Sequence, residues 1–121
     1  MKMSSNKYSI SVLLDDKRLQ AIKGTSLESK ITPMFGGAIK AIILQVPADL
    51  GKKIVNEFSS ARIDARGFIE EVPVAFKRKL FEEMVQIRST GPDVVEAVMS
   101  KLPELKAEAA KEEEYIPPPQ L

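Results

Sequence analysis

The side chains that most enzymes use for nucleophilic, acid–base or metal chemistry are largely missing from this chain. It contains no cysteine and no histidine, which excludes disulfides, thiolate metal sites, Cys-His pairs and Ser-His-Asp triads. Adjacent carboxylates occur at Asp15-Asp16, Glu70-Glu71 and Glu82-Glu83. Adjacent residues on a helix point about 100° apart, so two adjacent carboxylates on a helix cannot form an acid–base pair on one face. We therefore predict that the chain is not an enzyme and has no catalytic residue, metal site or cofactor.

Two glycine-containing segments lack the spacing of nucleotide-binding loops. Gly51-Lys52-Lys53 has Val46 where a P-loop needs its first glycine, and no Ser or Thr follows the lysine. Gly36-Gly37 is not part of a GxGxxG pattern, so we expect a turn or a close backbone contact there. Neither segment predicts a nucleotide site.

The charge is distributed unevenly along the chain. The net charge is +1, but residues 1–91 carry fifteen Lys/Arg and ten Asp/Glu, whereas residues 92–121 carry three and seven. A basic body followed by an acidic end is typical of proteins that meet a charged partner. The candidate phosphate-binding residues are Lys52, Lys53, Arg62, Lys77, Arg78, Lys79, Arg88, Thr90 and Gly91. Arg62 and Arg88 have a structural alternative, because a cation in the last turn of a helix also favours the helix dipole.

Residues 84–98 resemble the helix-hairpin-helix element of DNA-binding proteins. Ile87 stands at the apolar position before the hairpin, and Gly91-Pro92 stands at its second glycine. The resemblance implies that backbone N–H groups at the hairpin grip a DNA phosphate. Ser89 replaces the first hairpin glycine, and Asp93 replaces a residue that is usually basic.

The C-terminal segment resembles the acidic tails of single-stranded DNA-binding proteins. Glu112-Glu113-Glu114 precede Tyr115-Ile116, and the chain ends at Leu121, although Pro117-Pro118-Pro119 departs from that family. The resemblance implies recruitment of a partner protein, with Tyr115, Ile116 and Leu121 as its contacts.

The first half of the chain predicts a strand followed by shorter elements. Residues 8–14 alternate apolar and polar side chains, which predicts a half-buried strand. Asp15 or Asp16 then caps a short helix through Ile22, or residues 19–22 form the return strand of a hairpin; the sequence leaves both open. Thr25 and Glu28 have the spacing of a capping box. Residues 38–46 fit either a buried strand or a helix.

The second half is predicted to be helical. Residues 47–62 and 73–88 form two helices that resemble each other at an offset of 26 residues, each starting at a proline. Gly51 in the first of them indicates close packing. A further helix starts near Thr90 with Pro92 in its first turn. Residues 104–114 are polar on every side, so we expect them to be exposed or frayed, and we expect residues 115–121 to be extended.

The predicted fold class is therefore α+β and helix-dominated, with an N-terminal strand or hairpin followed by three or four packed helices. We expect one small globular domain over residues 1–103 and an acidic, proline-ended flexible tail over residues 104–121. The polar start and the absence of a long apolar run predict a cytoplasmic protein with no membrane partner. The composition is also compatible with a thermophilic source.

Two functions fit these observations. The first is a non-catalytic nucleic-acid-associated protein or small accessory subunit of a nucleoprotein complex, which binds a DNA or RNA backbone. The second is a protein-interaction module, such as an adaptor, inhibitor or assembly factor, that uses paired amphipathic helices and its tail. A continuous basic face over both central helices would favour the first function, and an even potential would favour the second. A homo-oligomer fits either function.

Overall fold

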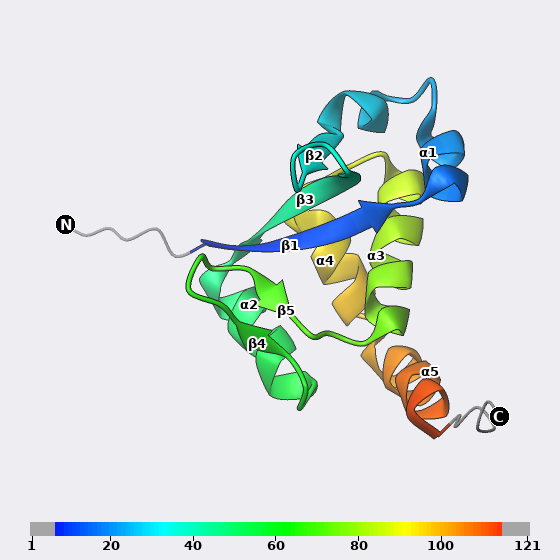
Figure 1. Ribbon diagram of the computed structural model, residues 1–121. Helices are drawn as coiled ribbons and strands as arrows, with labels where there is room; N and C mark the ends of the chain where they lie inside the picture. The colour runs from blue at the N-terminus through cyan, green and yellow to red at the C-terminus, as the bar shows by residue number, and fades with distance from the viewer. Residues whose placement is uncertain (1–6, 115–121) are drawn as a thin grey trace, which may run out of the picture.

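The computed structural model describes residues 7–114, and the side chains of residues 7–111, as an α+β fold (Figure 1). This confirms the predicted fold class. The elements are, in chain order, β1 (Lys7–Leu14), α1 (Asp16–Ile22), the 3-10 turn η1 (Ser26–Lys30), β2 (Thr32–Met34), β3 (Ile39–Pro47), α2 (Ala48–Glu57), β4 (Arg62–Ile63), β5 (Ile69–Glu70), α3 (Val74–Ile87), α4 (Pro92–Met99) and α5 (Leu102–Glu114).

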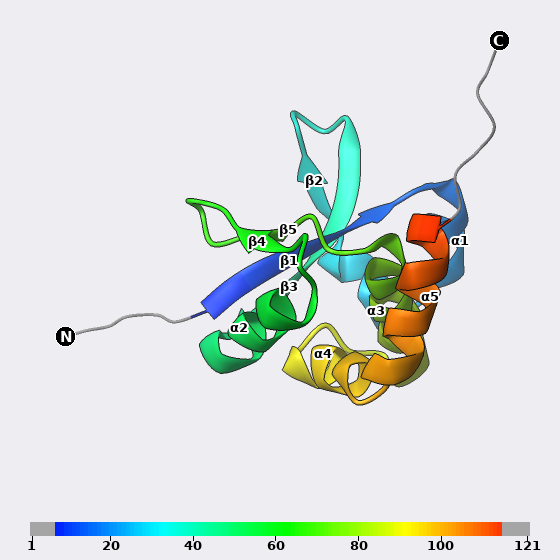
Figure 2. The same ribbon diagram turned by 90° about the horizontal axis from the view of Figure 1, so that it is seen from below.

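A three-stranded antiparallel sheet in the order β1-β3-β2 organises the fold. Ile10 pairs with Leu44 and Val12 with Ile42, and all four side chains are fully buried on one face of the sheet. Figures 1 and 2 show α2, α3 and α4 on this same side. The segment around residues 38–46, which by sequence could be a strand or a helix, thus forms the strand β3. It lies between β1 and β2 and pairs with both, which β-branched side chains favour.

Short polar side chains set the local structure after β1. Asp15 caps α1 by accepting a hydrogen bond from the Arg18 N–H at 2.9 Å, so the helix alternative is the correct one. Thr25 caps η1 by accepting from the Leu27 N–H at 3.2 Å. Glu28 accepts from the Gly24 N–H at 3.1 Å rather than from the cap residue itself. The predicted capping box is therefore displaced by one residue and closes a 3-10 turn.

The prediction of a helix over residues 47–62 is wrong at its C-terminal end. The helix α2 ends at Glu57 because Phe58 turns to an extended backbone and places its ring 5.5 Å from that of Phe76 in the core. Arg62 lies in strand β4, not in the last turn of a helix, so the helix-dipole explanation fails for it. Asp64 closes the β4–β5 hairpin by accepting from the N–H groups of Arg66 and Phe68, both at 2.9 Å.

The expectation that residues 104–114 are exposed is also wrong in part. Leu105 is only 1% exposed and Ala109 is buried, because α5 runs antiparallel to α3 and covers it. Lys101 pairs with Glu83 at 2.8 Å at the start of α5, and Glu108 pairs with Arg78 at 3.2 Å further along. The predicted domain boundary at residue 103 thus falls at the second residue of α5. None of the helices in residues 7–114 combines the length and apolar character needed to cross a bilayer.

Candidate functional site

The predicted phosphate-binding residues lie on four separate parts of the fold. They are on α2 (Lys52, Lys53), β4 (Arg62), α3 (Lys77, Arg78, Lys79) and the α3–α4 junction (Arg88, Thr90, Gly91). Both views place α4 between α2 and α3 (Figures 1 and 2). The two central helices that resemble each other in sequence therefore do not form one helix pair. Instead, α3 packs mainly against α4 and α5.

Several of these cations have carboxylate partners within the protein. Arg62 pairs with Glu70 at 3.1 Å, Arg78 pairs with Glu108 at 3.2 Å, and Lys79 lies 3.6 Å from Glu108. These pairs are partly exposed, so each contributes little to stability. The pairs of Arg78 and Lys79 with Glu108 offset part of the positive charge along α3. Arg78 and Lys79 on α3 are thus partly neutralised within the described part of the chain, and α4 lies between them and Lys52 and Lys53 on α2 (Figures 1 and 2).

The α3–α4 junction uses its polar groups internally. Arg88 ends α3 in the left-handed conformation, with φ 55°. The Gly91 N–H donates to the Ser89 hydroxyl at 3.0 Å, and this hydroxyl donates to the Asp93 carboxylate at 2.7 Å. A phosphate at this hairpin would have to displace Ser89 and approach the negative charge of Asp93. The sequence positions that depart from the helix-hairpin-helix family therefore occupy the place where that family binds DNA.

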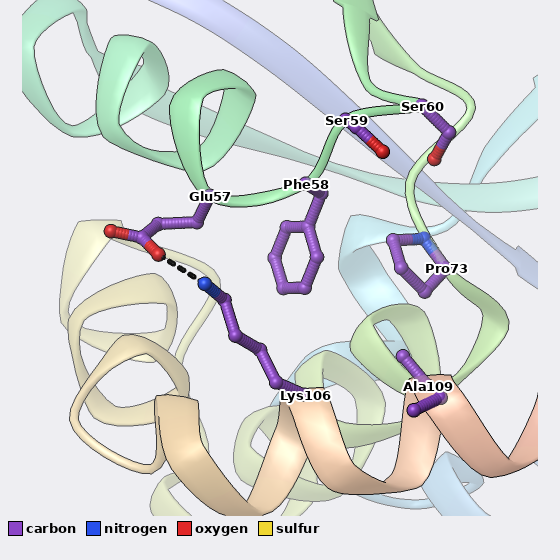
Figure 3. Close-up of a pocket in the computed structure, with 8 residues that line it drawn as sticks. Glu57, Phe58, Ser59, Ser60, Pro73, Lys106 and Ala109 are labelled. Carbon is purple, nitrogen blue, oxygen red and sulfur yellow. Dashed lines mark ion pairs between the residues drawn. The ribbon is translucent and has the colours of Figure 1, made fainter.

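A cavity of about 230 Å³ lies between the end of α2 and α5 (Figure 3). The ring of Phe58 stands between Pro73 and an ion pair of Glu57 with Lys106, whose Oε1 and Nζ are 2.6 Å apart. The Lys106 ammonium lowers the pKa of Glu57 by hydrogen bonding and by its charge. Glu57 is therefore a weak base, and the pair serves to hold α5 against α2. No sequence pattern predicted this pair, because Glu57 and Lys106 are 49 positions apart in the chain.

The β2–β3 hairpin carries the most exposed large apolar side chain of the described residues. Phe35 is 74% exposed at the tip, with a left-handed backbone at φ 54°. Gly36 and Gly37 follow with φ 67° and 92°, and the Gly37 N–H donates to the Met34 carbonyl at 3.1 Å. The turn expected at Gly36-Gly37 is therefore present, and Phe35 stands directly before it. The signal that identifies a turn is the Gly36-Gly37 pair directly after it.

None of the helices in residues 7–114 covers the sheet face beside this tip (Figure 2). The strand register places Leu13, Ile43, Ile39 and Met34 on the side opposite the buried core residues. Leu13 is 43% exposed and the other three are half-buried. Figure 2 shows the helices gathered on the other side of the sheet. We call these four residues together with Phe35 the tip surface.

The sequence matches a protein-family model over most of its length. The model of a Family of unknown function (DUF6955) matches residues 8–99. The chain belongs to this family. The matched segment starts in β1 and ends at the last residue of α4, so it includes the tip surface and the α3–α4 junction. The helix α5 follows it. No curated protein and no solved structure matches the chain.

The remaining predicted contacts, Tyr115, Ile116 and Leu121, lie outside the described residues. In the described part of the chain, no three Asp or Glu residues are grouped closely enough to hold a metal ion.

Proposed function

We propose that this protein is a protein-interaction module without catalytic activity, and that it binds another protein through the tip surface. The observation that carries this proposal is Phe35, which is 74% exposed at a backbone φ of 54°. A side chain other than Gly, Asn or Asp in this region costs roughly 1–2 kcal/mol. An exposed aromatic ring in such a position brings little stability to the fold, whereas aromatic rings are enriched at protein interfaces.

The neighbouring side chains support the same conclusion. Leu13, Ile43, Ile39 and Met34 continue the apolar character of the tip across the helix-free sheet face. A contiguous apolar patch of this kind marks an interaction site in many soluble proteins. The partner we expect is a protein with an apolar cavity that receives Phe35 and a flat apolar surface that covers the sheet face.

Binding of a DNA or RNA backbone is the second candidate. Lys52 and Lys53 are adjacent and exposed on α2, which favours it. The carboxylate partners of Arg62, Arg78 and Lys79 and the occupied Gly91 N–H weigh against it. We therefore place it behind protein binding, with Lys52 and Lys53 as the residues on which it now depends.

The test compares wild-type protein with Phe35→Ser and with Ile87→Ser, a matched control because Ile87 is an exposed apolar residue on α3. Proteins captured by the wild type are purified and titrated against all three forms. We expect Phe35→Ser to weaken binding at least about tenfold, or about 1.4 kcal/mol, and Ile87→Ser to leave it unchanged. Equal affinity for all three forms would refute the proposal.

A parallel titration addresses the second candidate. Labelled single- and double-stranded oligonucleotides are titrated with wild type and with a Lys52→Glu/Lys53→Glu variant over a salt series. We expect no binding that depends steeply on salt. Nucleic-acid binding would instead be established by a binding constant that falls by about 0.7–0.9 log units per log unit of salt for each phosphate contact, if this dependence disappears in the variant.

A further inference from the structure

A second apolar surface lies between α1 and α3. Phe81 and Val85 are four residues apart on α3, so they lie on one face of that helix. Together with Ala21 of α1 they line an open groove of about 410 Å³, whose lining is mainly apolar. The exposed residues Glu82 and Gln86 form its border on α3. We call it the α1–α3 groove.

Two cations stand beside Phe81 in this groove. The Arg18 guanidinium lies over the Phe81 ring, 5.2 Å from its centroid, and it donates to the Leu13 carbonyl at 2.9 Å, which holds it in place. Lys77 precedes Phe81 by one helical turn and is half-buried. Burial lowers the pKa of Lys77, the charge of Glu70 opposes this change, and the charge of Arg18 adds to it. The two cations are therefore close enough to act together on a bound ligand.

The carboxylates nearby are paired with other cations. Glu70 forms ion pairs with two arginines of the β4–β5 hairpin, at 3.1 Å and 3.8 Å. Glu82 at the border of the groove lies 3.6 Å from Lys79. Within residues 7–111, neither Lys77 nor Arg18 has a carboxylate at ion-pair distance. The groove thus combines an apolar lining with positive charge that the described part of the chain offsets only in part.

A ligand that suits this groove brings apolar side chains and a carboxylate together. A cation that has lost part of its hydration without gaining an ion-pair partner is stabilised by an incoming carboxylate. The Phe81 and Val85 side chains are stabilised by apolar groups that exclude water from them. A groove between two helices is a common seat for the apolar face of an amphipathic helix. The distance along α3 from Lys77 to Val85 is about 12 Å, which two to three turns of such a helix would cover.

We propose that the α1–α3 groove binds an amphipathic helix of a partner protein, with apolar side chains and a carboxylate on the same face. The apolar side chains cover Phe81 and Val85, and the carboxylate, one helical turn away, pairs with Lys77 and Arg18. A basic helix is disfavoured, because its lysine or arginine at this place would meet two like charges. This proposal does not depend on the tip surface, which is built from other elements.

The test selects helical peptides that bind the full-length wild-type protein from a displayed library with equal numbers of acidic and basic residues. We expect the selected peptides to carry Asp or Glu one turn from a pair of apolar residues. Lys77→Gln and Val85→Ser should each weaken their binding at least about tenfold. The matched controls Lys52→Gln on exposed α2 and Ile87→Ser at the exposed end of α3 should leave it unchanged. Circular dichroism establishes that each variant is folded, and Lys77→Gln decides alone if Val85→Ser is not.

A further variant, Phe35→Ser, separates the groove from the tip surface. Peptides that bind in the groove should bind this variant as tightly as the wild type. The proposal would be overturned if no peptide is selected, if the selected peptides are basic, or if Lys77→Gln binds them as tightly as Lys52→Gln does. It would also be overturned if Phe35→Ser loses every selected peptide. A wild-type dimer in sedimentation that Lys77→Gln abolishes would mean that a second copy, rather than a partner protein, occupies the groove.

Discussion

Gly51 lies in the middle of α2, where its Cα faces the ring of Tyr8 on β1. A Cβ at this position would collide with Cδ2 of that ring, and it would lie 3.2 Å from Cε2 and 3.4 Å from Cγ. In an exposed helix, Gly→Ala stabilises by up to about 1 kcal/mol. A methyl group forced into a packed contact costs typically 1–3 kcal/mol. We therefore predict that Gly51→Ala destabilises the protein by about 1 kcal/mol.

The measurements are urea unfolding and thermal unfolding, both followed by far-ultraviolet circular dichroism. Asn56→Ala is the matched control, because Asn56 is exposed in the same helix and also gains helix propensity. In thermal unfolding, a loss of 1 kcal/mol corresponds to a decrease in Tm of roughly 4 °C, because a chain of 121 residues lies between small and medium-sized domains. We expect this decrease for Gly51→Ala and no decrease for Asn56→Ala.

A double-mutant cycle with Tyr8→Ala tests the physical cause. Tyr8→Ala lowers stability by itself, but it also removes the ring that a Cβ at Gly51 would meet. In that background Gly51→Ala should stabilise, since only its helix propensity remains. If Gly51→Ala stabilises the wild type, or destabilises both backgrounds equally, the steric explanation is incorrect.

Two further predictions concern α5 and the β4–β5 hairpin. Leu105→Ala should lower the free energy of unfolding by about 2–5 kcal/mol because Leu105 is buried. The control Glu104→Ala, on the exposed side of α5, should change it by less than about 0.5 kcal/mol. Equal effects of the two substitutions would mean that α5 is not part of the core. The hydrogen bond from the Phe68 N–H, followed by those from Arg66, lowers the pKa of Asp64 below its ordinary 3.8. The stability that its carboxylate contributes is therefore complete above pH 3.8 and is lost as the pH falls through the lowered pKa. Asp64→Asn should accordingly lose less stability than the wild type between pH 5 and pH 2 in urea titrations, and an identical loss in both proteins would contradict this assignment.

The elements that the sequence predicted correctly depend on near neighbours in the chain. The alternation in residues 8–14 predicted β1, and Pro73 and Pro92 marked the starts of α3 and α4. The Asp15 side chain needs only the N–H of Arg18 to cap α1. These interactions extend over a few residues and are therefore visible in the sequence.

The errors have a common physical cause, which is that distant residues decide the outcome. Residues 58–62 leave the helix because Phe58 packs against Phe76. Polar residues surround Leu105 in the sequence, yet its side chain completes the core against α3. An amphipathic pattern with few apolar positions does not show which of them another helix will cover.

The sequence alone determined the composition limits, the α+β class and the local caps, because each follows from residue types and short spacings. Only the tertiary structure decided that β3 is the central strand, since that requires β1 and β2 on its two sides. It also decided that Glu108 offsets Arg78 and that Phe35 stands exposed at a hairpin tip. Charged and apolar side chains form a functional surface only through the residues that the fold places beside them. Two residues in contact can be 30 positions apart in the chain, as Arg78 and Glu108 are.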